Sequence, residues 1–278
     1  MKRRPRSVSD TEVPGRRRPG AGQVIGELLL TAGVVILLFV IYEAFWTNIV
    51  SGRLQDELNN SLEESWAEVP EASGVIDGQP VSPLIPVLGE GFARVHFPTL
   101  GAAYAIVEGT RNEDLRAGPG HYPDSQMPGE AGNFALAGHR NGSGAVFQHL
   151  DRLDACDAVV VETEFQWMTY RLLPLDQASP ERRAAAKACL NPEQADRVSE
   201  GDYVHLLGRR ITVPGDVAVV NPLPGSPWAE PDATLESMLT LTTCHPLYSN
   251  SERLIVHAVL VETISKTSGT IPAAFQEQ

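Results

Sequence analysis

The feature that most constrains this chain is an apolar run at residues 24–46, in which only Glu27 and Glu43 are charged. At a rise of about 1.5 Å per residue, a helix of this length crosses a hydrocarbon core about 30 Å thick and leaves both carboxylates near its ends. Aromatic residues close the run, as the interfacial belt of a membrane protein would: Tyr42, Phe45 and Trp46. The run therefore predicts one transmembrane helix.

Basic residues flank this helix on its N-terminal side. Residues 1–26 hold seven Arg or Lys against two acidic residues, including an arginine triplet at 16–18. The positive-inside rule places such a flank in the cytoplasm and exports everything after residue 46. A cleaved signal peptide would need a shorter apolar core and a small-residue cleavage site, which does not follow Phe45. A buried core helix would not carry the basic flank. We therefore expect an uncleaved signal anchor of a single-pass protein of the cell membrane, with an extracellular domain.

The exported part of the chain is acidic. From residue 47 onward it carries 15 basic and 31 acidic side chains. A surface of this sign repels the phosphate backbone, which excludes nucleic acid as a partner. The His, Cys, Asp and Glu residues show neither zinc-site spacing nor an EF-hand loop. The sequence therefore predicts no metal and no cofactor.

Composition divides the chain into five segments. Residues 1–23 are rich in Arg, Pro and Gly and are expected to form a disordered cytoplasmic tail. The anchor at 24–46 is followed by residues 47–90, which begin with an amphipathic stalk helix and continue as a linker punctuated by Pro and Gly. Residues 91–265 form the folded domain, and residues 266–278 are expected to be a flexible C-terminal tail.

The folded domain has the pattern of a β protein. Short runs rich in β-branched and aromatic residues are separated by turn residues. The expected strands are 92–97, 104–107, 133–137, 158–162, 166–173, 203–207, 217–221, 239–243 and 253–264. Such a series predicts an all-β barrel or sandwich. A helix-like segment at 179–195 interrupts it.

Three residues far apart in the sequence are suited to acyl transfer. Cys244 ends an apolar–Thr alternation, so we expect its sulfur at a strand end that faces a cleft. Arg253 opens the next strand, and a hairpin between the two strands would bring it close to Cys244. With His139, the chain then holds a nucleophile, a proton donor and an oxyanion stabiliser. By residue type alone, Cys244 fits a small buried hydrophobe equally well.

Six segments resemble the sortases, and class E most of all, over residues 24–264. They are GELLL at 26–30, GPGHYP at 118–123, GNFALAGHR at 132–140, LDRL at 150–153, TLTTC at 240–244 and RLIV at 253–256. The resemblance implies an eight-stranded sortase-type β-barrel with short helices. It also implies a cysteine transpeptidase whose catalytic residues are Cys244, His139 and Arg253.

The reaction implied by this resemblance has two steps. Cys244 attacks the threonine carbonyl of a C-terminal sorting signal, which in class E resembles Leu-Ala-x-Thr-Gly, and His139 protonates the leaving glycine amine. Arg253 holds the oxyanion. An amine of a peptidoglycan precursor then resolves the thioester and fixes the surface protein to the wall. The candidate substrate-binding residues are Tyr122, His121 and Thr243.

The remaining two cysteines are expected to pair. Disulfides persist outside the cytoplasm, and a thiol enzyme must keep Cys244 free. Cys156 and Cys189 would then bond and tie the 179–195 segment, which is longer than the family's connection, to the barrel. The other expectation is that both are isolated buried thiols.

Three other functions stay open at this point. A pilin-polymerising sortase often carries a lid over its site, for which residues 80–86 lack an acidic–aromatic element. An L,D-transpeptidase would show a Ser-His-Gly-Cys type of motif, whereas two threonines precede Cys244. An inactive sortase-like binding domain would not need the three intact catalytic residues.

The orientation of the anchor can be tested by proteolysis. In cells stripped of their wall, added protease should digest residues 47–278 and leave residues 3–18 protected, because the basic flank is held in the cytoplasm. Mapping the protected peptides by mass spectrometry measures this. Protection of the folded domain would contradict the expected orientation.

Overall fold

The structure is a computed structural model that describes residues 20–42, 47–67, 85–142, 144–175, 179–227, 230–266 and 269–277. It divides into two compact units, Met1–Glu43 and Ala44–Gln278. From the sequence we expected a disordered tail at 1–23 and a linker after the stalk helix. We also expected Phe45 and Trp46 to lie at the membrane interface. Most of that tail, the linker residues 68–84 and both aromatics lie outside the described residues.

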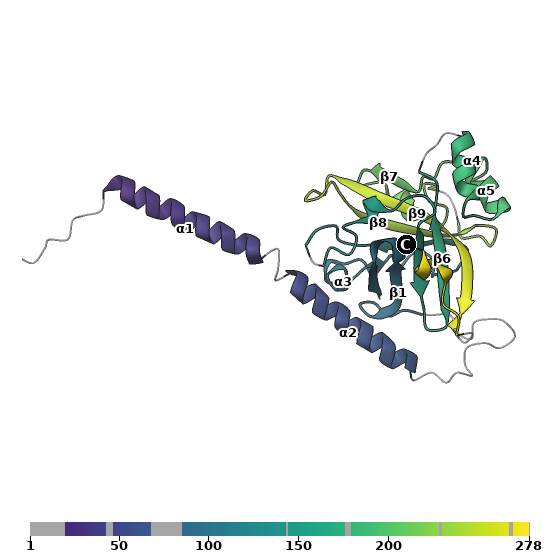
Figure 1. The fold of residues 1–278 in the computed structure, drawn as a ribbon, viewed down its shortest axis with the longest axis horizontal. Coiled ribbons are helices and arrows are strands. Elements are labelled where there is room, and N and C mark those ends of the chain that lie inside the picture. The colour runs from purple at the N-terminus through teal and green to yellow at the C-terminus, as the bar shows by residue number, and fades with distance from the viewer. Residues whose placement is uncertain are drawn as a thin grey trace, which may run out of the picture. The chain divides into compact units, whose positions relative to one another are not determined.

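The described part of the first unit is one helix, α1 (Ala21–Ile41), shown in Figure 1. It is long and apolar enough to cross a membrane, and none of its residues is buried against other parts of the protein. The helix begins three residues before the predicted span. Its length and composition support a single membrane anchor, and the orientation of that anchor stays a prediction.

The second unit is built on a closed β-barrel. Its strands are β1 (Gly91–Phe97), β2 (Ala102–Glu108), β3 (Gly120–His121), β4 (Gly132–Ala137), β5 (Ala158–Glu162), β6 (Gln166–Leu172), β7 (Arg209–Thr212), β8 (Ser237–His245) and β9 (Glu252–Ser265). In the described residues their order is β6-β5-β1-β2-β3-β4-β8-β9-β7, and β6 also pairs with β9. That last pairing closes eight strands into a barrel and leaves β7 outside it, so the predicted fold is confirmed.

Two of the expected strands are wrong. In 203–207 the buried side chains are Tyr203 and Leu206, three positions apart, and the chain forms turns there. The apolar run at 217–221 forms a 3₁₀ helix, η5 (Val217–Val220). Strands β3 and β7 were missed because they are only two and four residues long and β7 begins with two arginines; pairing with neighbouring strands holds both extended.

The amphipathic helix is present as α2 (Thr47–Ala67), but it is not a free stalk. Leu62 is buried with 2% of its area exposed. The Gln55 side chain accepts a hydrogen bond from Ala105 N at 2.8 Å and donates one to Ala105 O at 3.1 Å. The helix therefore packs on the barrel wall beside β2. The periodicity of residues 47–67 predicted an apolar face on this helix but did not indicate that the barrel covers it.

The C-terminal segment also packs on the barrel, so the expectation of a flexible tail at 266–278 is wrong for its described residues. The 3₁₀ helix η7 (Ala273–Gln276) buries Ala274, and the ring of Phe275 lies 5.5 Å from that of Trp167. Glu277 accepts two hydrogen bonds from Arg171, at 2.6 and 2.7 Å. These contacts hold the described residues of the segment against the barrel.

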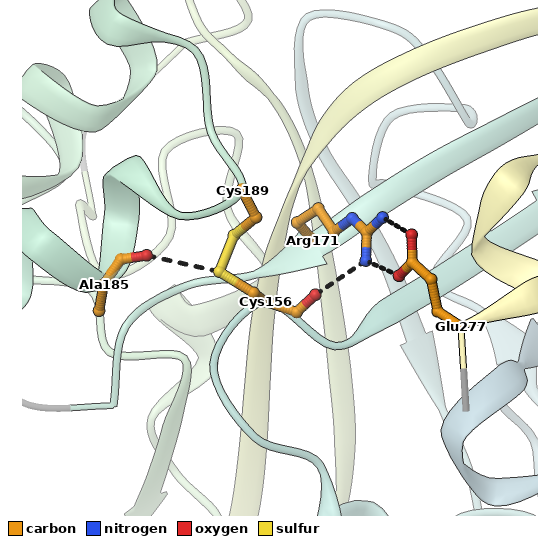
Figure 2. The surroundings of a disulfide bond; sticks show 5 residues. All are labelled: Cys156, Arg171, Ala185, Cys189 and Glu277. Atoms are coloured by element: carbon orange, nitrogen blue, oxygen red, sulfur yellow. Dashed lines mark hydrogen bonds and ion pairs between the residues drawn. A yellow bond between two sulfur atoms is a disulfide. The ribbon is translucent and has the colours of Figure 1, made fainter.

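The segment at 179–195 is helical, as expected. It contains α4 (Ser179–Lys187) and the start of α5 (Pro192–Ser199), whose N-terminus is capped by the Asn191 side chain. Figure 2 shows the disulfide between Cys156 and Cys189, with Cα atoms 5.7 Å apart. Arg171 donates to the Cys156 carbonyl at 3.1 Å, so the disulfide and the C-terminal segment share one guanidinium.

The disulfide should be visible in solution. Unfolded, non-reduced protein should show one free thiol, and three would contradict the bond. Because the bond closes a loop with a sequence separation of 33, the chain-entropy relation predicts that a Cys156→Ser, Cys189→Ser double variant loses about 3–4 kcal/mol of unfolding free energy. Denaturant titration measures that loss, with Cys244→Ser as the control that leaves the disulfide intact.

Candidate active site

The predicted nucleophile, Cys244, and the guanidinium-bearing Arg253 meet across a pair of neighbouring strands. In the antiparallel ladder of β8 and β9, Cys244 pairs directly with Arg253. Directly opposite residues on one face have Cβ atoms roughly 4.5–5.5 Å apart. Both residues are partly exposed, and Cys244 is a free thiol. The hairpin predicted from the sequence is therefore present, with the expected residues at its end.

The loop after β4 brings His139 to the same end of the barrel. Strand β4 runs parallel to β8, with Ala137 opposite Thr242. Gly138 N donates to Thr242 O at 3.1 Å, and the Thr243 hydroxyl donates to Gly138 O at 2.7 Å. His139 is the next residue. Three adjacent strands, β4, β8 and β9, thus gather all three predicted catalytic residues at one edge.

A packing contact fixes the course of the chain at Gly138. A Cβ atom at this position would lie 2.5 Å from the ring of Phe147, which is fully buried. Phe147 N also donates to His139 O at 3.0 Å. Glycine is therefore required before His139, because any side chain would displace the aromatic ring that supports the loop.

The protonation of His139 is biased toward the neutral form. Burial lowers the pKa of its imidazole, and the positive charge of Arg116 lowers it further. Arg116 belongs to α3 (Asn112–Ala117), a helix that the sequence did not connect with the site. At neutral pH the ring is therefore mostly uncharged and able to accept a proton.

Arg253 is held by two backbone carbonyls of its own hairpin, one in the loop and one at the start of β9. Its Nη1 donates to Asn250 O at 3.0 Å and to Glu252 O at 2.9 Å. Two carbonyls on one nitrogen fix the plane of the guanidinium, whose other N–H donors point along different directions of the same rigid fork.

The three candidate substrate-binding residues differ in exposure. Tyr122 is partly exposed, and its hydroxyl lies 2.9 Å from the Thr242 hydroxyl, two residues before the nucleophile. Thr243 has 3% of its area exposed, and its hydroxyl donates a hydrogen bond to Gly138 O. Tyr122 therefore stays a candidate for contact with a peptide, whereas Thr243 links β8 to the segment after β4.

His121 is buried, with 1% of its area exposed, so direct contact with a substrate does not fit this structure. Its Nδ1 lies 2.6 Å from Glu108 Oε2, and its Nε2 lies 3.0 Å from the Ser125 hydroxyl. Ser125 in turn donates to Tyr122 O at 2.8 Å. His121 therefore supports the turn that carries Tyr122. Its partner Glu108 is distant in sequence, and nothing in the sequence pairs the two.

Metal ligation finds no support in the parts of the chain that the structure describes. They contain no group of three or more His, Cys, Asp and Glu side chains arranged to hold an ion. The expectation of an enzyme without metal or cofactor stays a prediction.

A closed eight-stranded barrel with Cys, His and Arg at one edge is the arrangement of a sortase. The Sortase domain family model matches residues 95–261, and the chain belongs to this family. Sortases are cysteine transpeptidases.

Individual relatives agree with that assignment. Sortases SrtE1 and SrtE2 of Streptomyces coelicolor are 30% and 31% identical to 91% and 90% of this chain. The aligned regions span 62% of SrtE1 and 87% of SrtE2. The solved SrtF sortase of Corynebacterium diphtheriae is 50% identical, with a TM-score of 0.69 over 72% of this chain and 98% of that one. The class E resemblance is confirmed, and a class F protein is similar as well.

The influence of Arg116 on His139 can be measured. Arg116→Gln should raise the pKa of His139, because it removes a nearby positive charge that disfavours the imidazolium. Burial remains, so the pKa should stay below that of a free histidine. NMR titration of the His139 ring measures both values, and Arg116→Lys, which keeps the charge, should leave the pKa near that of the wild type. An unchanged pKa in Arg116→Gln would exclude the interaction.

Proposed function

We propose that this protein is a membrane-anchored transpeptidase that cleaves a Leu-Ala-x-Thr-Gly type of C-terminal sorting signal between Thr and Gly. It then transfers the protein to an amine of a peptidoglycan precursor. The observation that carries the proposal is the pairing of Cys244 with Arg253 beside the strand that leads into His139. This is the set of groups needed for a thioester route, at one edge of one barrel.

The first half-reaction makes the thioester. The Cys244 thiolate attacks the threonine carbonyl, and the carbonyl electrons move onto oxygen. When the tetrahedral species collapses, the C–N bond breaks and the glycine nitrogen takes the proton from the His139 imidazolium. Because the pKa of His139 is lowered, its protonated form is a stronger acid than a free imidazolium, although it is the minor form at neutral pH.

Arg253 is proposed to stabilise the oxyanion. The carbonyls of Asn250 and Glu252 accept from Nη1, and the guanidinium carries further N–H donors for the developing charge. A guanidinium offers fixed, charged donors, and such a donor is worth most where water is excluded. The loop contacts would then prevent the fork from rotating during the reaction.

The second half-reaction releases the product. A neutral amine attacks the thioester carbon, and His139, now neutral, removes the ammonium proton as the C–S bond breaks. An amide forms, and the Cys244 thiolate is regenerated. The lowered pKa of His139 supports this step also, since a mostly neutral imidazole can accept the proton at physiological pH.

The proposed signal preference rests on Tyr122 and on the relatives. The Tyr122 hydroxyl stands beside Thr242 on the nucleophile's strand, where it can meet polar backbone groups of an extended peptide. Relatives named sortase E support a class E signal. Leu-Pro-x-Thr-Gly is the alternative signal to be tested, and the two peptides differ only at the second position.

The proposed setting is the outer face of the cell membrane. One anchor helix with a basic N-terminal flank would leave the catalytic domain outside the cell. There it would meet both proposed partners, which are exported proteins with a C-terminal sorting signal and the peptidoglycan precursor that supplies the amine.

Substitutions test the three roles. Cys244→Ala and His139→Ala should abolish transpeptidation while the thermal unfolding transition persists. Arg253→Lys should lose about 10²–10³-fold in kcat, because a point charge does not replace a fixed oxyanion donor. Arg152→Gln, an exposed arginine, is the matched control. Near-normal turnover of Arg253→Lys would show that the oxyanion role is assigned wrongly.

Product analysis tests the reaction itself. Leu-Ala-x-Thr-Gly and Leu-Pro-x-Thr-Gly peptides are incubated with several amines, and mass spectrometry should find the threonine carbonyl joined to the amine and a thioester on Cys244. Faster turnover of the alanine peptide is expected. Threonine acid as the sole product would refute transfer, and efficient joining to a protein lysine would favour a pilin polymerase.

A further inference from the structure

Arg140 follows His139 directly and is buried, with 3% of its area exposed. A guanidinium keeps its charge in proteins, so burial is costly unless its N–H groups find acceptors. The reaction proposed above gives this residue no role. Its buried Nε has no hydrogen-bond partner among the described residues, so its polar contacts are those of the two terminal nitrogens.

The guanidinium reaches two other segments of the active-site edge. Its Nη1 lies 2.6 Å from His245 Nδ1 and 3.5 Å from Cys244 O, both at the end of β8. Its Nη2 lies 3.2 Å from a carboxylate oxygen of Asp151 in the 3₁₀ helix η4 (Leu150–Arg152). One planar group therefore joins the His139 loop, the nucleophile's strand and a surface helix.

The contact with His245 has a definite direction. Arginine has donors and no acceptor, so His245 Nδ1 must accept the hydrogen bond. The ring proton of a neutral His245 then lies on Nε2, which is 4.0 Å from Glu252 Oε2. This geometry predicts one tautomer of a histidine next to the nucleophile.

We call the contacts of Arg140 with His245 and Asp151 the clamp. The clamp lies just beyond the point where the pairing of β4 with β8 ends. In the described residues, the last backbone hydrogen bond between these two segments runs from Gly138 N to Thr242 O. His139 and Cys244 lie beyond it. We propose that Arg140 is a positioning residue that sets the distance between the imidazole and the thiol, an inference that rests on the transpeptidase function proposed above.

Such a clamp matters because proton transfer needs close alignment. A displacement of about 1 Å can cost on the order of 10²-fold in rate. Lysine would keep the charge but could not serve two acceptors on separate segments with a fixed plane. The clamp should therefore act on kcat through geometry and have little effect on peptide binding.

Four variants separate this role from a general loss of stability. Arg140→Lys and Arg140→Gln remove the guanidinium, and His245→Ala removes Nδ1, the atom that accepts its hydrogen bond. His245→Asn restores an acceptor oxygen near the position of Nδ1. Arg152→Gln is the control that removes a nearby exposed charge and leaves the clamp intact. For each, kcat and KM for the sorting peptide, the alkylation rate of Cys244 by iodoacetamide and the melting temperature are measured.

The expected result is a loss of about 10- to 100-fold in kcat for Arg140→Lys and His245→Ala. KM and the alkylation rate should stay within about threefold of the wild type, because the thiol itself is untouched. His245→Asn should recover most of the loss. Normal kcat in Arg140→Lys overturns the proposal. So does a loss that appears in KM and melting temperature but not in kcat.

A readout without turnover keeps the clamp testable even if the wild type proves inactive, which would refute only the proposed function. In ¹⁵N spectra of the full chain, His245 Nδ1 should appear as a hydrogen-bonded acceptor and Nε2 as the protonated nitrogen. Arg140→Lys should change the Nδ1 signal, whereas Arg152→Gln should not. The opposite tautomer in the wild type would overturn the clamp.

Discussion

The parallel pairing of β4 with β8 places the imidazole of His139 at the same barrel edge as the thiol of Cys244. Parallel strands cannot be joined by a tight turn, so the chain must make a long excursion between them. That excursion contains β5, β6, both helices of the 179–195 segment and β7. The pairing of β6, which lies within this connecting segment, with β9, the neighbour of β8, closes the barrel. The catalytic edge therefore forms only when the whole barrel does.

Buried polar side chains hold these strands in register. The Thr240 hydroxyl donates to the Asn133 side chain at 2.7 Å and lies 2.9 Å from His257 Nδ1, which links β4, β8 and β9. Burial lowers the pKa of His257 to about 3, so the ring is neutral and adds no charge to the core. A slip by one residue would break these bonds and expose apolar side chains of the barrel interior.

Local pattern was sufficient for some of this architecture. The apolar run predicted the anchor helix, runs of β-branched and aromatic residues predicted most strands, and the short motifs pointed to Cys244, His139 and Arg253 as candidate catalytic residues. Contacts between segments distant in sequence could not be predicted in this way. The pairing of Glu108 with His121 and the contact of Arg140 with His245 depend on which strand ends meet. The docking of Phe275 on Trp167 has the same origin, which is why the C-terminal segment was expected to be flexible.

The disulfide has a consequence for how the three thiols of this chain are oxidised. Three cysteines allow three different pairings, and two of them consume Cys244, the proposed nucleophile. Cys156 and Cys189 have the smallest separation of the three pairs, 33 residues, and loop closure favours short loops by a logarithmic term. The pairing that is easiest to reach in an unfolded chain is thus the one that spares Cys244. In the proposed extracellular setting, oxidation then leaves the thiol of Cys244, the proposed nucleophile, free.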